Sequence, residues 1–108
     1  MAWFLLAFAG LLEVAWATGL KALALRFNPF LALFTALAMI LSLAALYGSM
    51  ARIPLGIAYP VWTAVGSLGA VAMSALVFGQ GLSLQALLGV LLILAGTLLL
   101  GLETVQAG

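Results

Sequence analysis

The sequence contains no cysteine and no histidine. This excludes disulfide bonds, a thiol nucleophile and the side chains that most often bind zinc or copper. Charged residues are also scarce, because three basic and two acidic side chains make up only 5% of the 108 residues. The basic residues form no cluster that could hold nucleic acid. Since no base–nucleophile pair is present either, we expect no enzyme, no metal site and no cofactor.

What the chain has in abundance is apolar sequence. Hydrophobic residues make up 69% of it, and the mean hydropathy is +1.44. A soluble domain of this size needs far more polar residues to cover its surface, so the composition predicts a membrane protein. Alanine pairs in the first segment resemble signal-peptidase sites, but no positively charged stretch precedes them. We therefore expect the first segment to be a resident helix.

The chain divides into four apolar stretches of about 20 residues, the length that crosses a bilayer core. Basic residues, prolines and glycine turns separate them. Asn28 followed by Pro29 suits the start of the second helix, and Ser83 suits the N-cap of the fourth. We predict an all-α membrane protein with one transmembrane domain (residues 1–108) and helices at about 2–23, 29–50, 56–78 and 83–102.

Two features favour oligomerisation. Four helices of this length make a thin bundle, which as a single copy could hardly enclose a polar site. In the fourth span Gly89, Ile93 and Gly96 fall on one face, and small residues there allow helices to approach closely. We predict this face as the dimer interface. The alternative is that glycine is simply common in membrane helices.

Loop charges give little bias to either orientation in the membrane. Lys21 and Arg26 lie on one side, and Arg52 with the α-amino group lies on the other. The positive-inside rule weighs such counts, which are nearly balanced here. The chain is therefore expected to insert both ways, and two opposite copies would pair as an antiparallel homodimer of dual topology.

Glu13 is an acidic residue near the middle of the first span. A charge placed there costs several kcal/mol, so an ionisable residue inside a membrane is by default a functional hypothesis. A cation beside the carboxyl group favours its ionised form, so proton and cation compete for one site, which is the minimum chemistry of an antiporter. The alternative is a protonated Glu13 that only hydrogen-bonds between helices.

Other polar and aromatic side chains are expected near Glu13. Trp16 lies one turn away on the same stripe, and Ser42 is the most central hydroxyl of the second span. Tyr59 and Trp62 share a face of the third span, where their rings could attract a cation. We predict that these four residues line a substrate site. The alternative for the aromatic residues is packing or anchoring at the membrane surface.

Three stretches, "GLLEVAWATGLK", "ARIPLGIAYPVWTAVG" and "GVLLILAGT", resemble the signature sequences of the small multidrug resistance family. The resemblance covers essentially the whole chain. It implies a proton-coupled exporter of organic cations, built as an antiparallel homodimer in the bacterial inner membrane. It also implies that Glu13 binds proton and substrate in turn, that Tyr59 and Trp62 are the aromatic residues of the site, and that residues 89–97 form the dimerisation motif.

The subtype within this family follows from a few positions. Trp16 with "ATGLK", Met39 with Ser42, and the "VWT" that contains Trp62 resemble the guanidinium exporters. In that branch Trp16, Ser42 and Trp62 help to hold the carboxylates through hydrogen bonds. The fourth span instead resembles the exporters of quaternary ammonium and aromatic drugs, but that helix does not line the site. We therefore favour guanidinium and alkylguanidiniums, with the broader drug exporter as the alternative.

Two departures from the family pattern bear on the third span. Pro60 replaces the usual alanine and removes a backbone donor, which is harmless near a helix start but would kink the helix and turn Trp62 if it lay deeper. Ala64 stands where the family has the first glycine of a hinge. Gly66 and Gly69 remain, and we predict them as the hinge.

Two other classes of function stay open on the sequence. A non-transporting subunit of a heteromeric complex is one of them, although paired partners would need opposite charge biases, and the loops here are nearly balanced. An ion channel is the other. It would need a continuous polar stripe through several helices, which this sequence does not provide.

Overall fold

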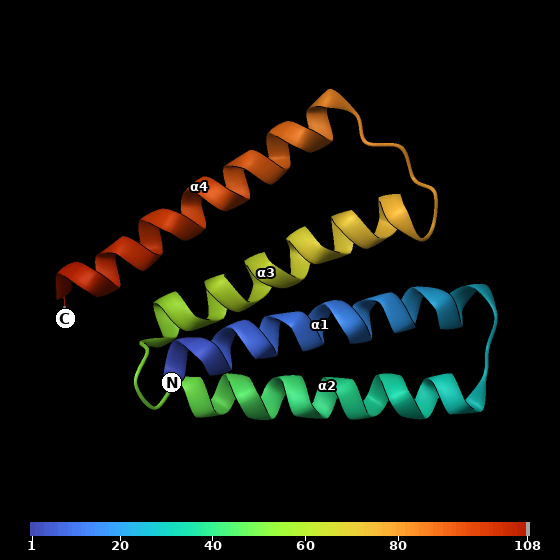
Figure 1. Cartoon of the computed structure of the whole chain (residues 1–108), viewed down its shortest axis with the longest axis horizontal. Helices are drawn as coiled ribbons and strands as arrows, with labels where there is room; N and C mark the ends of the chain where they lie inside the picture. Colours follow the sequence, from blue (N-terminus) through green and yellow to red (C-terminus); the bar gives the residue numbers. More distant parts are fainter. Residues whose placement is uncertain (108) are drawn as a thin grey trace.

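A computed structural model describes residues 1–107 of the chain, with side chains described to residue 102. It contains the helices α1 (Ala2–Leu25), α2 (Pro29–Ser49), α3 (Leu55–Leu76) and α4 (Leu84–Ala107) (Figure 1). All four are long and apolar enough to cross a membrane. The prediction of an all-α membrane protein with four spans is therefore confirmed. The ends differ most at α4, which continues beyond residue 102 to Ala107.

Helices α2 and α4 begin at residues whose side chains cap them. Asn28 Oδ1 accepts hydrogen bonds from the backbone N–H groups of Phe30 (2.9 Å) and Leu31 (3.4 Å), and Pro29 occupies the first turn, where it needs no donor. Ser83 Oγ accepts a hydrogen bond from the Ala86 N–H (3.1 Å) before α4. Both caps were expected from the sequence, and both set where the chain turns back into the membrane.

Helix α1 packs against both α2 and α3 and lies between them in Figure 1. Glycines make the approach of α1 and α3 close. A Cβ added to Gly10 of α1 would lie 2.5 Å from Val65 Cγ1, and one added to Gly69 of α3 would overlap the side chain of Val14. Neither helix could therefore keep its position if these glycines carried side chains.

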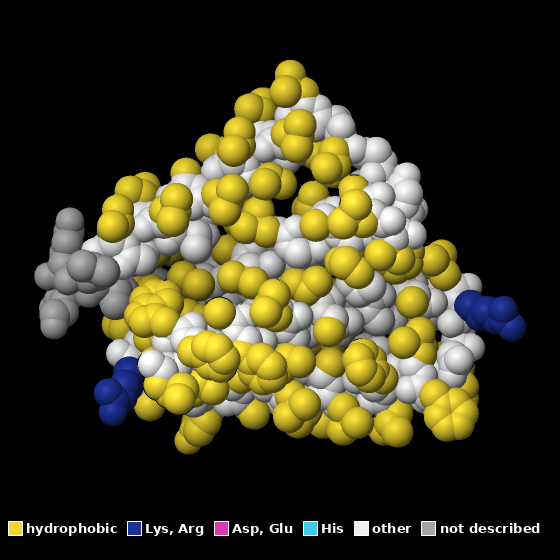
Figure 2. All heavy atoms as spheres, viewed as in Figure 1, with side chains coloured by type: hydrophobic (Ala, Val, Ile, Leu, Met, Phe, Trp, Pro, Cys, Tyr) yellow, Lys and Arg dark blue, Asp and Glu magenta, His cyan; other side chains and the backbone are white. Residues whose placement is uncertain are grey.

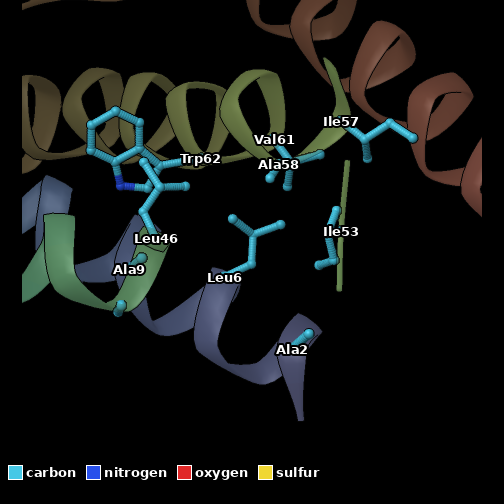
Figure 3. Close-up of a cluster of buried hydrophobic side chains, with 10 residues drawn as sticks. Ala2, Leu6, Ala9, Leu46, Ile53, Ile57, Ala58, Val61 and Trp62 are labelled. Atoms are coloured by element: carbon cyan, nitrogen blue, oxygen red, sulfur yellow. The ribbon is translucent and has the colours of Figure 1, made fainter. Parts of the chain in front are cut away.

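A hydrophobic cluster holds the three packed helices together at one end of the bundle. Leu6 of α1 and Trp62 of α3 are almost fully buried in it. Figure 3 shows that α1, α2, α3 and the turn between α2 and α3 all contribute side chains to the cluster. The cluster joins the part of α1 before Glu13 to the aromatic segment of α3.

Outside this cluster the surface is apolar. Figure 2 shows hydrophobic side chains over most of the visible face and basic side chains only at its two ends. Large apolar side chains such as Phe34 and Leu92 are exposed, at 60% and 74%. In water such a surface would aggregate, whereas lipid chains solvate it. The distribution fits a multi-pass membrane protein.

Helix α4 diverges from the other three helices (Figure 1). Among the described residues it contacts only α3, and none of its span is buried. The residues predicted as the dimer interface lie on it. Apart from the neighbouring backbone of α4, no atom of residues 1–102 lies within 4 Å of a Cβ added to Gly89 or Gly96, and Ile93 is half-buried. Their role in a dimer stays a prediction.

Candidate functional site

Glu13 lies on α1 with its carboxyl group against Gly66 of α3. A Cβ added to Gly66 would overlap the Glu13 carboxyl group and lie 2.8 Å from its Cγ. Gly66 is buried, and Glu13 Oε1 is buried with no hydrogen-bond partner within residues 1–102. The absence of a side chain at position 66 therefore makes the space in which the carboxyl group sits between two helices.

A chain of two hydrogen bonds connects the other helices to the turn that carries Glu13. Trp62 Nε1 donates to Ser42 Oγ (3.1 Å), and Ser42 Oγ donates to the backbone carbonyl of Ala9 (2.7 Å). Ser42 is completely buried and Trp62 is 6% exposed. In an α-helix the carbonyl of Ala9 also accepts the N–H of Glu13. The link from α3 through α2 thus ends on the same turn of α1 as the carboxyl group.

Aromatic rings lie next to this link. The ring centroids of Tyr59 and Trp62 are 5.6 Å apart, with their planes inclined by 47°, and Tyr59 is half exposed. Trp16 packs against the hydrophobic cluster, and its Nε1 is buried without a partner among the described residues. An indole N–H can only donate, so Trp16 retains a donor one turn from the Glu13 carboxyl group.

The structure brings Ser42, Tyr59 and Trp62 together. That they line a substrate site stays a prediction. The described side chains include none that donates to the Glu13 carboxyl group, because Ser42 and Trp62 bond to each other and to the α1 backbone. Their role in holding the carboxyl group stays a prediction, as does that of Trp16.

Pro60 does not break α3, which is helical from Leu55 to Leu76. The proline lies in the second turn of this helix, and the Thr63 hydroxyl donates to the carbonyls of Tyr59 (3.1 Å) and Pro60 (3.0 Å) just after it. Trp62 still reaches Ser42. The proline therefore leaves α3 continuous and the bond between Trp62 and Ser42 in place.

Gly66 and Gly69, the predicted hinge, have a second use. Both are places where an α1 side chain packs directly on the α3 backbone. A bend at either glycine would change the contact with Glu13 or Val14. The hinge itself stays a prediction.

A cavity of about 280 Å³ lies between α1, α3 and the segment after α3, and its wall includes Ala17, Lys21, Met73 and Gln80. Ala17 is one helical turn from Glu13, but Glu13 itself does not line this cavity. Within the described chain no three potential metal ligands come together. The chemistry available is a single carboxyl group that can hold a proton or a cation.

Sequence reasoning missed two groups. The first is the carbonyl of Ala9, because every residue has a carbonyl and no residue type marks this one. The second is Thr35 of α2, whose hydroxyl is buried against Gly19 of α1. Thr35 could have been found, because it lies at the same seven-residue spacing as the other two buried hydroxyls of α2, Ser42 and Ser49.

Comparison with known proteins gives consistent results. A family model described as Small Multidrug Resistance protein matches residues 1–93. Proteins named guanidinium exporter from Citrobacter freundii and Salmonella typhimurium are each 43% identical to the chain over 106 residues, covering 96% of it and 99% of the relative. A guanidinium exporter from Escherichia coli O6:H1 is 41% identical over the same length.

The contact between Glu13 and Gly66 predicts a compensating pair of substitutions. Gly66→Ala should destabilise the protein by about 1–3 kcal/mol, because the new methyl group overlaps the carboxyl side chain. Glu13→Ala in the same chain should recover most of this loss, since it removes the overlapped atoms. Heating detergent-solubilised protein and quantifying the folded fraction by size-exclusion chromatography measures both. Gly56→Ala is the control, because nothing lies within 4 Å of a Cβ there. Equal loss with and without Glu13 would contradict the contact.

Proposed function

Because the chain belongs to the Small Multidrug Resistance family, we propose that it is a proton-coupled antiporter that exports small organic cations by alternating access. Guanidinium and alkylguanidiniums are the proposed substrates. The observation that carries this proposal is the carboxyl group of Glu13, which lies between two apolar helices against Gly66. Ser42 is connected to the same turn of α1 through the Ala9 carbonyl, and Trp16 packs against the hydrophobic cluster that contains Trp62. A proton or a cation can neutralise it there, but not both at once.

The chemistry of guanidinium suits this site. Its planar N–H groups form paired hydrogen bonds with a carboxylate, and its flat face stacks on aromatic rings. Tyr59 and Trp62 provide such rings, and Trp16 provides an unused donor that could orient the carboxylate. The relatives named guanidinium exporter match the segments that carry all of these residues, since the alignments cover 96% of the chain.

The proposed assembly is an antiparallel homodimer of dual topology in the bacterial inner membrane. Among the described helices α4 contacts only α3, and Tyr59 is half exposed. Lipid cannot satisfy polar groups, so a site that opens sideways needs a second copy to close it. The exposed α4 supports a dimer contact through Gly89, Ile93 and Gly96, and the balanced basic residues support two orientations.

The exchange mechanism predicts that Glu13→Gln abolishes proton-driven guanidinium flux, because the amide can neither bind a proton nor pair with a cation. Uptake into liposomes with an imposed pH gradient measures this flux. Glu13→Asp is the matched variant, and it should retain transport with an altered pH dependence. Cross-linking should show that the Gln variant still forms dimers. Gradient-driven flux at the parent level in the Gln variant would rule out the mechanism.

The dual-topology proposal predicts an effect of added charge. Gln80→Lys with Gly81→Lys adds two positive charges to the side that bears Lys21 and Arg26, which should give all copies one orientation. Gly79 is left unchanged because its φ of +70° favours glycine. The variant alone should be inactive and should regain activity with a copy carrying extra lysines beside Arg52. Full activity of the singly oriented protein would exclude an obligatory antiparallel pair.

The substrate proposal predicts selective transport. Guanidinium and small alkylguanidiniums should be exported, and a bulky quaternary ammonium should not, because it lacks planar N–H donors. Trp16→Gly should weaken guanidinium flux and admit larger aromatic cations, since it removes both an indole donor and bulk. Trp3→Phe is the control, because Trp3 is 44% exposed to lipid. A parent protein that transports the quaternary ammonium and ignores guanidinium would identify the drug exporter instead and leave the Glu13 exchange intact.

A further inference from the structure

The hydroxyl of Thr35 is the only one of the three buried hydroxyls on α2 that lacks a hydrogen bond within residues 1–102. Ser42 donates to Ala9 of α1, and Ser49 donates to the carbonyl of Leu46 in its own helix (2.8 Å). Thr35 is 3% exposed, so water does not reach its hydroxyl from the surface. A buried hydroxyl without a partner costs stability, and its retention therefore needs an explanation.

Thr35 also differs from the other described threonines. Thr18, Thr63 and Thr97 each donate to the carbonyl four residues earlier in their own helix, at 2.7, 3.1 and 2.7 Å. The same bond is available in principle to any threonine in a helix. The Thr35 hydroxyl instead lies in the notch at Gly19 of α1, where an added Cβ would overlap Oγ1 and lie 3.2 Å from the Thr35 Cβ. The packing of α1 on α2 therefore holds this hydroxyl away from its own helix.

The register of the two helices identifies the missing partner. Helices α1 and α2 are antiparallel neighbours (Figure 1), and Ser42 of α2 donates to the carbonyl of Ala9. Thr35 lies seven residues before Ser42 in α2, and Trp16 lies seven residues after Ala9 in α1. Seven residues are about two helical turns, so Thr35 lies on the face of α2 that carries Ser42, at the level of α1 near Trp16. The carbonyl of Trp16 points along α1 toward Gly19, where the Thr35 hydroxyl already lies.

We propose that Thr35 is a positioning residue for the transport cycle. In a second conformation of the chain its hydroxyl donates to the backbone carbonyl of Trp16, as Ser42 donates to that of Ala9. The two bonds then hold α1 on either side of Glu13 and fix the turn that carries the Trp16 indole. In this structure only the Ser42 bond is made, and the Thr35 end of the segment is held by packing at Gly19 without a hydrogen bond. This proposal rests on the proposed antiport function.

The first test separates the hydroxyl from the shape of the side chain. Thr35→Val keeps the branched shape and removes the donor, whereas Thr35→Ser keeps the donor. The matched control is Ser49→Ala, which removes a buried hydroxyl from the same face of α2 that bonds only within its own helix. Proton-driven guanidinium flux into liposomes should fall roughly three- to tenfold in Thr35→Val, the effect of losing about one hydrogen bond. Thr35→Ser and Ser49→Ala should stay near the parent.

The second test follows the bond itself and needs no transport. The chemical shift of a threonine γ-methyl carbon depends on its side-chain rotamer. Relaxation-dispersion NMR of the parent should therefore show that the Thr35 methyl group exchanges between two states. The indole ¹⁵N–¹H signal of Trp16 should exchange at the same rate in the parent and in Thr35→Ser, and this exchange should disappear in Thr35→Val. A merely structural threonine would not move the Trp16 signal.

The outcomes distinguish the two proposals. Absence of guanidinium flux in the parent contradicts the proposed function, and the methyl signal then still decides the conformational role of Thr35. Parent-level flux in Thr35→Val, or a single Thr35 methyl signal without exchange, overturns the positioning role and leaves antiport intact. Loss of flux in Thr35→Ser equal to that in Thr35→Val shows that the shape of the side chain matters rather than its hydroxyl, and also overturns the proposal.

Discussion

The packing of the Glu13 carboxyl group into an apolar bundle is the constraint on which the rest of the structure depends. Lipid provides no hydrogen bonds, so the group has to lie between helices. This places α1 in the middle of the three packed helices and requires a residue without a side chain opposite it. Gly66 meets that requirement, and the same close approach continues at Gly10 and Gly69. Gly66 leaves the space for the carboxyl group, and Gly10 and Gly69 allow the close approach of the two helices around it.

Besides the hydrophobic cluster, the hydrogen bonds and closest contacts that hold α1 to its neighbours are directed at the backbone. Ser42 bonds to a carbonyl of α1, and the glycine contacts are van der Waals contacts between side chain and main chain. Between membrane helices, association depends on such packing and on occasional hydrogen bonds, because lipid tails are as apolar as the helices. A bundle held in this way can rearrange by exchanging a small number of bonds. Alternating access requires that property.

Hydropathy and capping residues were sufficient to predict the four helices, since a bilayer demands a fixed length of apolar sequence. The face of each helix followed from its period, which is why Ser42 and Trp62 could be expected near each other, as their hydrogen bond shows. What the period does not contain is the rotation of one helix against another. For this reason the sequence did not indicate that Ser42 would donate to the backbone of Ala9, or that Thr35 would face Gly19. The divergence of α4 also escaped prediction, because a single apolar helix looks the same whether it packs on its own chain or elsewhere.

The separation of α4 from the other helices bears on how substrate preference should be judged. Every residue proposed to bind proton or cation lies on α1, α2 or α3, and α4 contacts only α3 within the described part of the chain. A likeness of the fourth span to drug exporters therefore concerns a helix that carries none of the proposed binding residues. Under the proposed function, substrate preference is set by side chains of α1, α2 and α3. Trp16 lies one helical turn from Glu13 and packs against the hydrophobic cluster, so its replacement by glycine would open space on that side of α1.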